Sequence, residues 1–266
     1  MQRQALEAEA HRGINALQQG DFIMARDAFA AVTASGDASP QAWLFYAQAC
    51  EGCDDRDQAL VALQPTTLEV REGELLLIIG PSGSGKTTLL SLLGCVIYPT
   101  EGRLWVEDNF VNDMTQSQLS RLRLNTIGFV FQNFNLLAPL NAAQNIGIPL
   151  QLMGKTGKDA DKKIKDALEL VGMTSRKNNL PKQLSGGEQQ RIAVARALVT
   201  DPKLVLCDEP TASLDKDSMV IVMEELKALA ERGKAVAVVT HDPRLKQYAD
   251  RIVEVNNGIA KEVKDY

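Results

Sequence analysis

The sequence predicts an α/β protein with a mostly parallel sheet and a helical subdomain, preceded by a small all-α segment. Three observations lead to this prediction. The composition changes sharply near residue 64, and short apolar runs typical of buried parallel strands follow that point. One of these runs leads directly into a glycine-rich loop and a helix. With 266 residues, the chain has room for one large domain or two smaller ones.

The composition limits the class of protein. Apolar residues make up 45% and charged residues 24%, as in ordinary globular proteins, and a net charge of −5 implies no polybasic surface for nucleic acid. No apolar run approaches the roughly 18 residues of a membrane span, and the first 20 residues do not resemble a signal peptide. Four cysteines without an export signal are typical of a reducing compartment. Cys50 and Cys53 are interpreted as structural thiols, because no second Cys or His pair follows at zinc-site spacing.

The charge and alanine content predict where the domains meet. Residues 1–64 contain 15 alanines, no lysine, and four arginines against nine acidic residues, which gives a net charge of −5. Residues 65–266 contain 25 basic and 25 acidic residues, which gives a net charge of zero. We therefore expect a helical segment over residues 1–64 and a larger domain over residues 65–266.

The N-terminal segment shows a weak internal repeat. A shift of 34 places aligns small residues with small or polar ones and large with large: Gly13 with Ala47, Gly20 with Asp54, Ala25 with Ala59, and Phe29 with Leu63. This period resembles the tetratricopeptide repeat over about two repeats. A generic alanine-rich pair of helical hairpins is the alternative. Because fewer than three repeats rarely bury a core alone, we expect a protein or peptide partner for this segment.

The glycine-rich loop has the composition and setting of a phosphate-binding P-loop. An apolar run from Glu74 to Ile79 precedes it, and a predicted helix from Thr88 to Val96 follows. Its glycines let backbone N–H groups converge on phosphate oxygens, and the helix N-terminus adds positive potential. Lys86 can reach the β- and γ-phosphates, and the hydroxyl of Thr87 can bind Mg²⁺. The loop and helix start consist of Gly80, Pro81, Ser82, Gly83, Ser84, Gly85, Lys86, Thr87 and Thr88.

Two further segments extend this chemistry. A second apolar run, Lys203 to Cys207, ends in Asp208, which can hold Mg²⁺, and in Glu209, which can polarise an attacking water. Between the two strands, Ser185, Gly186 and Gly187 open another predicted helix whose N-terminus lacks bulky side chains and so favours an anion. An ordinary Ser-capped helix is the alternative for these three residues. The chain thus has two helix N-termini that favour a phosphate, one after the glycine-rich loop and one at Ser185. This suggests that the second N-terminus of one copy binds the nucleotide held by the loop of another copy.

The order of these motifs resembles the ATP-binding cassette (ABC) ATPases over about residues 62–262. This family places its Walker A loop at Gly80 to Thr87, its signature at Leu184 to Gln190, and its Walker B carboxylates at Asp208 and Glu209. Short sequence segments, such as Leu89 to Gly94, resemble those of the lipoprotein-releasing and macrolide-exporter branch of this family. The resemblance implies a P-loop NTPase fold of ABC type, with a helical subdomain at roughly residues 133–200.

The resemblance also implies roles for single residues. Glu209, His241 and Gln132 are expected to be catalytic, with Gln132 also contacting the metal beside Thr87 and Asp208. Ser185, Gly186, Gly187 and the D-loop residue Asp215 are expected at the nucleotide of a second copy. The implied cofactors are ATP and Mg²⁺. The implied partners are a second copy of the chain and a separate transmembrane permease, with the chain cytoplasmic and peripheral on the inner face of the cell membrane.

One departure from the family pattern affects recognition of the base. Family domains begin with a strand carrying an aromatic residue that stacks on adenine, and no aromatic residue lies between Tyr46 and Tyr98 here. This leaves two hypotheses open. The chain is an ATPase subunit of a transporter, or it is a nucleotide-gated scaffold, or a truncated or chimeric cassette, with weak ATPase activity.

The missing aromatic residue predicts poor discrimination between bases. Stacking of a base on an aromatic side chain is worth roughly 1–3 kcal/mol. We therefore expect similar affinities for ATP and GTP in equilibrium titrations of the purified chain. A strong preference for ATP would show that another aromatic residue, such as Trp43 or Tyr46, stacks on the base.

Overall fold

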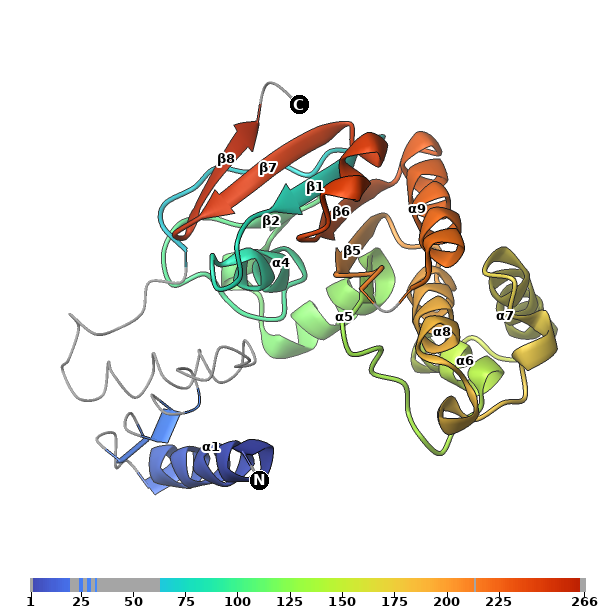
Figure 1. The fold of residues 1–266 in the computed structure, drawn as a ribbon, viewed down its shortest axis with the longest axis horizontal. Helices are drawn as coiled ribbons and strands as arrows, with labels where there is room; N and C mark the ends of the chain where they lie inside the picture. Colours follow the sequence, from blue (N-terminus) through green and yellow to red (C-terminus); the bar gives the residue numbers. More distant parts are fainter. Residues whose placement is uncertain are drawn as a thin grey trace. The chain divides into compact units, whose positions relative to one another are not determined.

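The computed structural model describes residues 2–19, 24–25, 28–29, 32, 63–212 and 214–263 (Figure 1). The chain divides into two compact units, Met1–Gln64 and Pro65–Tyr266. In the first unit, helix α1 spans Gln2–Gln19, and a Cβ added at Gly13 would come within 2.6 Å of the Phe29 ring. The repeat interpretation depends mainly on residues outside the described ranges, as does the Cys50–Cys53 pair. Both therefore remain predictions.

A six-stranded sheet forms the centre of the second unit, in the order β4-β5-β6-β1-β7-β8. All neighbouring strands are parallel except the antiparallel pair β7 and β8. The central strands β1 and β6 are apolar along their length because both faces of the sheet are covered. The strands span Leu75–Ile79 (β1), Ile127–Val130 (β4), Leu204–Asp208 (β5), Ala235–Val239 (β6), Arg251–Asn256 (β7) and Ile259–Val263 (β8).

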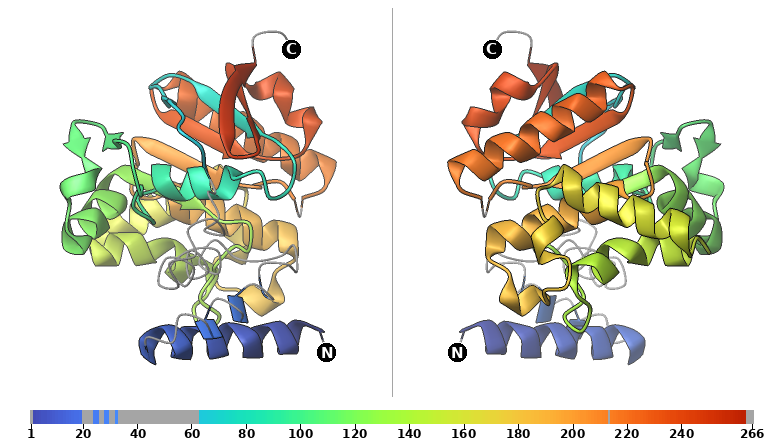
Figure 2. Two further views of the ribbon diagram at one scale, coloured as in Figure 1. Left: turned by 90° about the vertical axis from the view of Figure 1, so that its left-hand side faces the viewer. Right: turned by 90° about the vertical axis from the view of Figure 1, so that its right-hand side faces the viewer.

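Helices cover both faces of this sheet (Figures 1 and 2). Helix α4 packs on β5 and β6, and α9 packs on β6 and β1. From β1 the chain passes through α4 and on to β4, at one end of the strand order. From β5 it passes through α9 to β6, which is a step toward the opposite end of the strand order. Right-handed crossovers therefore put these two helices on opposite faces. The helices span Lys86–Leu93 (α4), Gln116–Thr126 (α5), Ala142–Leu152 (α6), Lys158–Leu170 (α7), Gly186–Leu198 (α8) and Lys216–Glu231 (α9).

Short elements complete the unit. A two-stranded hairpin joins β2, Trp105–Val106, to β3, Asn109–Phe110. Short 3₁₀ helices connect the longer elements, at Val111–Asp113, Thr174–Arg176, Pro181–Gln183 and Pro243–Tyr248. Helices α6, α7 and α8 pack on one another, and α8 also packs on β4. One continuous apolar core, which includes Leu77, Ile146, Ile192 and Val238, joins these helices to the sheet.

Local sequence signals set the starts of three helices. Thr115 with Gln118, Asn141 with Gln144, and Ser185 with Glu188 each form a capping box, at the starts of α5, α6 and α8. In each box the first side chain accepts the backbone N–H of the third helical residue, and that residue's side chain accepts the N–H of the cap. Each of these helix starts is therefore determined by two residues that lie three positions apart.

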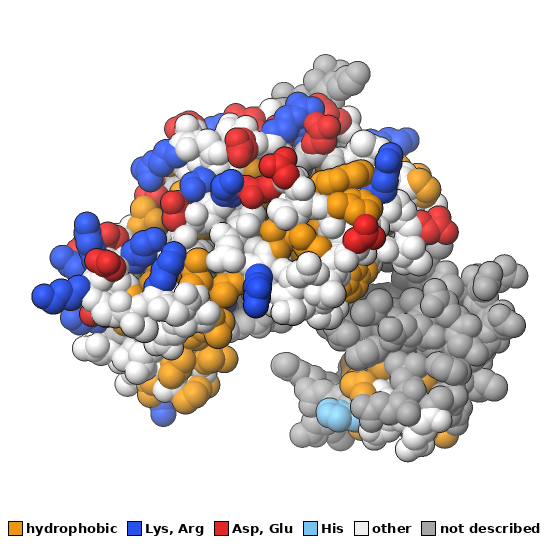
Figure 3. Space-filling model, turned by 180° about the vertical axis from the view of Figure 1, so that it is seen from behind, with side chains coloured by type: hydrophobic (Ala, Val, Ile, Leu, Met, Phe, Trp, Pro, Cys, Tyr) orange, Lys and Arg blue, Asp and Glu red, His pale blue; other side chains and the backbone are white. Residues whose placement is uncertain are grey.

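The surface of the second unit agrees with its balanced charge. On the face shown in Figure 3, acidic and basic side chains are interspersed, with apolar side chains between them. Within the described ranges, no helix is both long and apolar enough to cross a bilayer.

Gly128 tests how tightly α8 packs on the sheet. A Cβ at this position in β4 would lie 2.4 Å from the backbone oxygen of Ala197 in α8. Gly128→Ala should therefore lower the free energy of unfolding by about 1–3 kcal/mol, since the backbone of α8 must shift. The measurement is urea unfolding followed by circular dichroism.

Gly147→Ala is the matched control. A Cβ there would meet only the flexible end of Ile164, at 3.0 Å, and alanine favours the helix by about 0.5–1 kcal/mol. We expect this variant to be as stable as the wild-type chain or slightly more so. Equal stability of Gly128→Ala and the wild-type chain would contradict the close packing.

Candidate functional site

The expected site residues follow the carboxyl ends of neighbouring parallel strands. The glycine-rich loop follows β1, Asp208 and Glu209 end β5, and Thr240 and His241 follow β6. Because β5, β6 and β1 are adjacent, these three segments meet at one edge of the sheet. Gln132 follows β4, the next strand beyond β5, and its side chain is exposed. Ligands of open parallel sheets bind at this edge.

The glycines of the loop are required by its geometry. Gly80 has φ 151°, and a Cβ there would lie 2.1 Å from the backbone oxygen of Val255. Gly85, with φ 103°, caps the N-terminus of α4. The ammonium of Lys86 donates hydrogen bonds to the backbone oxygens of Gly80 (2.9 Å) and Pro81 (2.8 Å). The loop therefore holds a positive charge on its inner side, beside the helix N-terminus.

The buried charges of the site influence one another. Burial lowers the pKa of Lys86, while Glu209 and Asp208 raise it. Burial and the neighbouring Glu209 raise the pKa of Asp208 to about 6, although Lys86 and a hydrogen bond with Thr87 act in the opposite direction. The carboxylate of Asp208 therefore carries a charge that the folded protein solvates poorly, as expected for a group that binds a cation.

Glu209 has the setting of a general base. Its side chain is largely buried, and its backbone adopts φ 48°. Its carboxylate accepts a hydrogen bond from Thr240 Oγ1 at 3.1 Å and contacts His241 Nδ1 at 2.6 Å. The His241 side chain is 73% exposed, so it has room to rotate away. Thr240 thus fixes one carboxylate oxygen, while the other oxygen lies beside an exposed imidazole.

The signature residues form a second cluster. Ser185 caps α8, with its hydroxyl 3.2 Å from the backbone nitrogen of Glu188. Asp215 caps α9 and accepts two hydrogen bonds from Ser218, which keep its pKa below the ordinary value. Arg191 Nη1 donates to Ser218 Oγ at 2.7 Å and so connects the two helix starts. Ser213, two positions before the D-loop residue Asp215, lies outside the described residues.

Comparison with known proteins agrees with this arrangement. Residues 63–212 match the family model described as "ABC transporter". An uncharacterized ABC transporter ATP-binding protein of Thermotoga maritima is 44% identical over 197 residues, which are 74% of this chain and 84% of that protein.

The chain belongs to the ABC transporter family. It is an ATP-binding subunit of the type that hydrolyses ATP, and the expected fold class and function are confirmed at that level. The cassette is also similar to a dimeric structure of the ATP-binding cassette MJ0796 bound to ADP and Pi. The TM-score is 0.72 and the identity 38%, over 77% of this chain and 92% of that one.

Some relatives are much longer than the cassette. The macrolide export ATP-binding/permease protein MacB of Agrobacterium fabrum is 39% identical over 203 residues, which are 76% of this chain. The chain spans only 31% of the length of that protein.

The donor set of the cassette fits Mg²⁺ shared with phosphate. In the part of the chain that the structure describes, no group of three His, Cys, Asp or Glu side chains could hold a metal alone. Thr87 and Asp208 instead share a hydrogen bond at the start of the P-loop helix. Mg²⁺ is usually bound by one or two protein oxygens together with phosphates and water. One carboxylate and one hydroxyl meet that requirement.

Two residues that contact or connect the expected site residues were not predicted from the sequence. Thr240 was not predicted to orient Glu209, and Arg191 was not predicted to connect the signature to the start of α9. The position of Thr240 directly before His241 is a weak signal for the former. Nothing in the sequence signals the latter, because Arg191 and Ser218 are 27 positions apart.

The raised pKa of Asp208 predicts a pH-dependent effect on stability. The folded chain binds this proton more tightly than the unfolded chain, so ionised Asp208 reduces stability above pH 6 and has no effect below about pH 4. In EDTA, Asp208→Asn should therefore raise the free energy of unfolding at pH 8 by about 3 kcal/mol. The gain should disappear as the pH falls from 6 to 4. Denaturant unfolding at several pH values measures it.

Asp215→Asn is the matched control. Its pKa is lowered by hydrogen bonds from Ser218, so its ionised form stabilises the fold at neutral pH. Asp215→Asn should slightly destabilise the chain at pH 8, the opposite direction from Asp208→Asn. A destabilised Asp208→Asn chain at pH 8 would contradict the interpretation of Asp208 as a poorly solvated charge.

Proposed function

We propose that this cassette hydrolyses ATP as the motor subunit of a transporter, closing on two ATP molecules as a dimer and driving a separate permease. The observation that supports this most directly is the meeting of Lys86, Asp208, Glu209 and His241 at one edge of the sheet. The paired Glu209 and His241 favour turnover over a scaffold that only binds nucleotide.

The P-loop binds the phosphates of ATP. Backbone N–H groups of Gly83, Gly85 and the first turn of α4 face the phosphate oxygens, and Lys86 supplies the positive charge. Thr87, Asp208 and Gln132 hold Mg²⁺, which neutralises phosphate charge when bound. The remaining residues, Gly80, Pro81, Ser82, Ser84 and Thr88, shape the loop around the phosphates.

Glu209 activates the attacking water. Thr240 holds one carboxylate oxygen, so the other oxygen is oriented to accept the proton. His241 contacts that second oxygen, at 2.6 Å, and its exposed ring turns to the γ-phosphate once nucleotide is bound. This movement leaves the oxygen free to accept the proton from water.

A second copy completes each nucleotide site. Ser185, Gly186 and Gly187 lie at the N-terminus of α8, where backbone N–H groups favour an anion. In the dimer they bind the γ-phosphate held by the partner's P-loop. Asp215 is connected to the same helix, because it accepts a hydrogen bond from Ser218, and Ser218 in turn accepts one from Arg191 of α8. The similar cassette that was solved with ADP and Pi is itself a dimer.

The permease is a separate chain in this proposal. MacB relatives carry both an ATP-binding and a permease function by name, and the cassette corresponds to 31% of their length. The cassette then works in the cytoplasm, on the inner face of the cell membrane, and belongs to the macrolide-exporter and lipoprotein-releasing branch. The N-terminal segment binds a protein or peptide, as its repeat-like pattern predicts.

Glu209→Gln separates binding from hydrolysis. The amide keeps the size of the side chain but cannot act as a base, so the ATPase rate should fall by about 10²–10⁴. ATP should still bind and persist between two cassettes. Size-exclusion chromatography with Mg-ATP should therefore show a dimer that dissociates when ATP is withdrawn.

Two variants in this background locate the interface. Glu209→Gln with Ser185→Arg should stay monomeric, because the arginine blocks the approach of α8 to the partner's nucleotide. Glu209→Gln with Ser117→Arg adds the same charge to an exposed position on α5 and should still form a dimer. A Glu209→Gln chain that stays monomeric at saturating Mg-ATP would argue against the dimeric motor.

A further inference from the structure

The turn that follows Gln132 has a strained backbone. Phe134 and Asn135 adopt φ angles of 56° and 49°, in the left-handed region that residues other than glycine rarely occupy. The turn is tight, with the backbone nitrogen of Asn135 only 2.5 Å from the oxygen of Asn133. Such backbone persists only where the surrounding structure holds it. Two successive residues in this region therefore need an external contact.

Arg196 in α8 provides that contact. Its Nη1 donates to the backbone oxygen of Asn135 at 2.5 Å, and its Nη2 donates to the oxygen of Phe134 at 2.7 Å. One planar guanidinium thus binds the two carbonyls of the strained pair, a geometry that a lysine cannot reproduce.

A second anchor fixes the far side of the same loop. Asn145, fully buried in α6, accepts the backbone N–H of Leu137 and donates to the oxygens of Leu137 and Leu140. Gln132 therefore lies between the end of β4 and a loop that Arg196 holds near its start and Asn145 holds near its end. The two carbonyls that Arg196 binds, at Phe134 and Asn135, are nearer to Gln132 in sequence than those that Asn145 binds.

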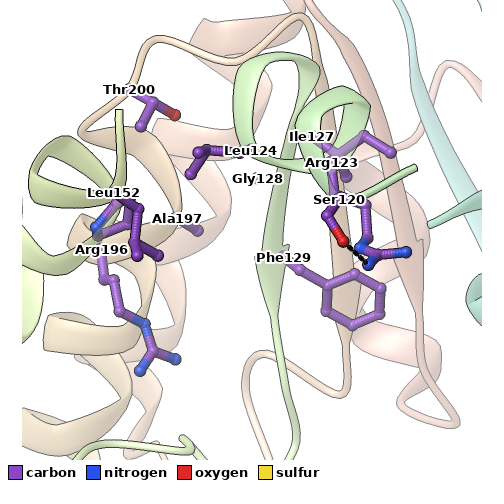
Figure 4. A pocket seen from close by; sticks show the side chains of 11 residues that line it. Ser120, Arg123, Leu124, Ile127, Gly128, Phe129, Leu152, Arg196, Ala197 and Thr200 are labelled. Atoms are coloured by element: carbon purple, nitrogen blue, oxygen red, sulfur yellow. Dashed lines mark hydrogen bonds between the residues drawn. The ribbon is translucent and has the colours of Figure 1, made fainter. Parts of the chain in front are cut away.

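Arg196 also lies in the wall of a cavity of about 430 Å³ (Figure 4). Figure 4 shows Arg196, Ala197 and Leu152 on one side of the cavity and Phe129, Ser120 and Arg123 on the other. Phe129 stacks on Phe131, next to Gln132, with ring centroids 4.2 Å apart. Both walls of this cavity thus contact the segment that carries Gln132.

We propose that Arg196 is a positioning residue for Gln132, because it holds the strained turn and thereby directs the glutamine side chain to the Mg²⁺–phosphate site. Arg196 belongs to α8, the helix whose first turn carries Ser185. Arg196 therefore connects two sites of the proposed dimer. It holds the turn beside Gln132, which belongs to the cassette's own nucleotide site, and it lies on α8, whose first turn binds the partner's nucleotide in the proposal. The inference rests on the proposed role of Gln132 in hydrolysis.

A double-mutant cycle tests this role. Arg196→Lys keeps the charge but loses the paired hydrogen bonds, so kcat should fall about ten- to a hundredfold, with KM for ATP changed less than about threefold. The Mg²⁺ concentration for half-maximal activity should rise. In a Gln132→Ala chain, Arg196→Lys should have almost no further effect on kcat, since both changes remove the same contribution.

Arg123→Lys is the matched control. This arginine lies on the opposite wall of the cavity and donates to the backbone oxygen of Cys95 and to Ser120 Oγ. Arg123→Lys should leave kcat and the Mg²⁺ dependence unchanged. Independent, multiplicative effects of Arg196→Lys and Gln132→Ala in an active cassette would overturn the proposal, and so would a loss of thermal stability with unchanged kcat.

A rescue variant covers the case in which Arg196→Lys does not fold. Glycine adopts positive φ without cost, so Asn135→Gly should restore folding and part of kcat to Arg196→Lys. A double variant that also fails to fold would show that Arg196 only stabilises the fold. A wild-type chain without Mg²⁺-dependent turnover would instead overturn the proposed function, and this inference with it.

Discussion

The buried charge of Lys86 is the constraint on which the rest of the site depends. Its side chain is only 8% exposed, and a buried ammonium needs hydrogen bonds and opposite charges. The backbone oxygens of Gly80 and Pro81 supply the hydrogen bonds, and Asp208 and Glu209 supply the charges. These groups come from two different strands, so the charge balance exists only when β1 and β5 lie on either side of β6. The loop, the sheet order and the acidic strand end therefore depend on one another.

The charges around Lys86 also affect the two carboxylates, Asp208 and Glu209. Asp208 is a poorly solvated carboxylate, which favours exchange of its proton for a metal ion. Glu209 is held by Thr240 on one oxygen and contacts the exposed His241 on the other. The two neighbouring carboxylates thus differ in environment, and our proposal of metal binding for Asp208 and proton transfer for Glu209 rests on this difference.

Helix α8 connects the elements of the cassette. Its first turn carries the signature residues, Arg191 contacts the start of α9, and Arg196 binds the turn after Gln132. These contacts lie along a single helix, so a displacement of α8 would move the signature residues, the start of α9 and the turn after Gln132 together. Gly128 allows this helix to pack directly on β4 and so ties the helix to the sheet.

Local sequence was sufficient for the parts of the site that are built from neighbouring residues. The P-loop, the acidic end of β5 and the cap of α8 were predicted because each is a short run whose backbone and side chains act within a few positions. In the structure Asp208 ends β5, Glu209 follows it, and the glycine-rich loop joins β1 to α4, while the roles of these residues at a nucleotide remain predictions. The tetratricopeptide interpretation remains a prediction, because most of its residues lie outside the described ranges.

Tertiary structure decided how these runs come together. The order β4-β5-β6-β1 depends on packing between segments far apart in the chain, and apolar runs alone cannot specify which strand neighbours which. The contacts of Thr240 with Glu209, Arg191 with Ser218 and Arg196 with Asn135 join residues 27 to 61 positions apart. The sequence alone determined which residue types are available for the proposed chemistry. Only the packing of α8 and the sheet decided which side chains orient that chemistry, because a hydrogen bond between distant residues depends on the position of both backbones.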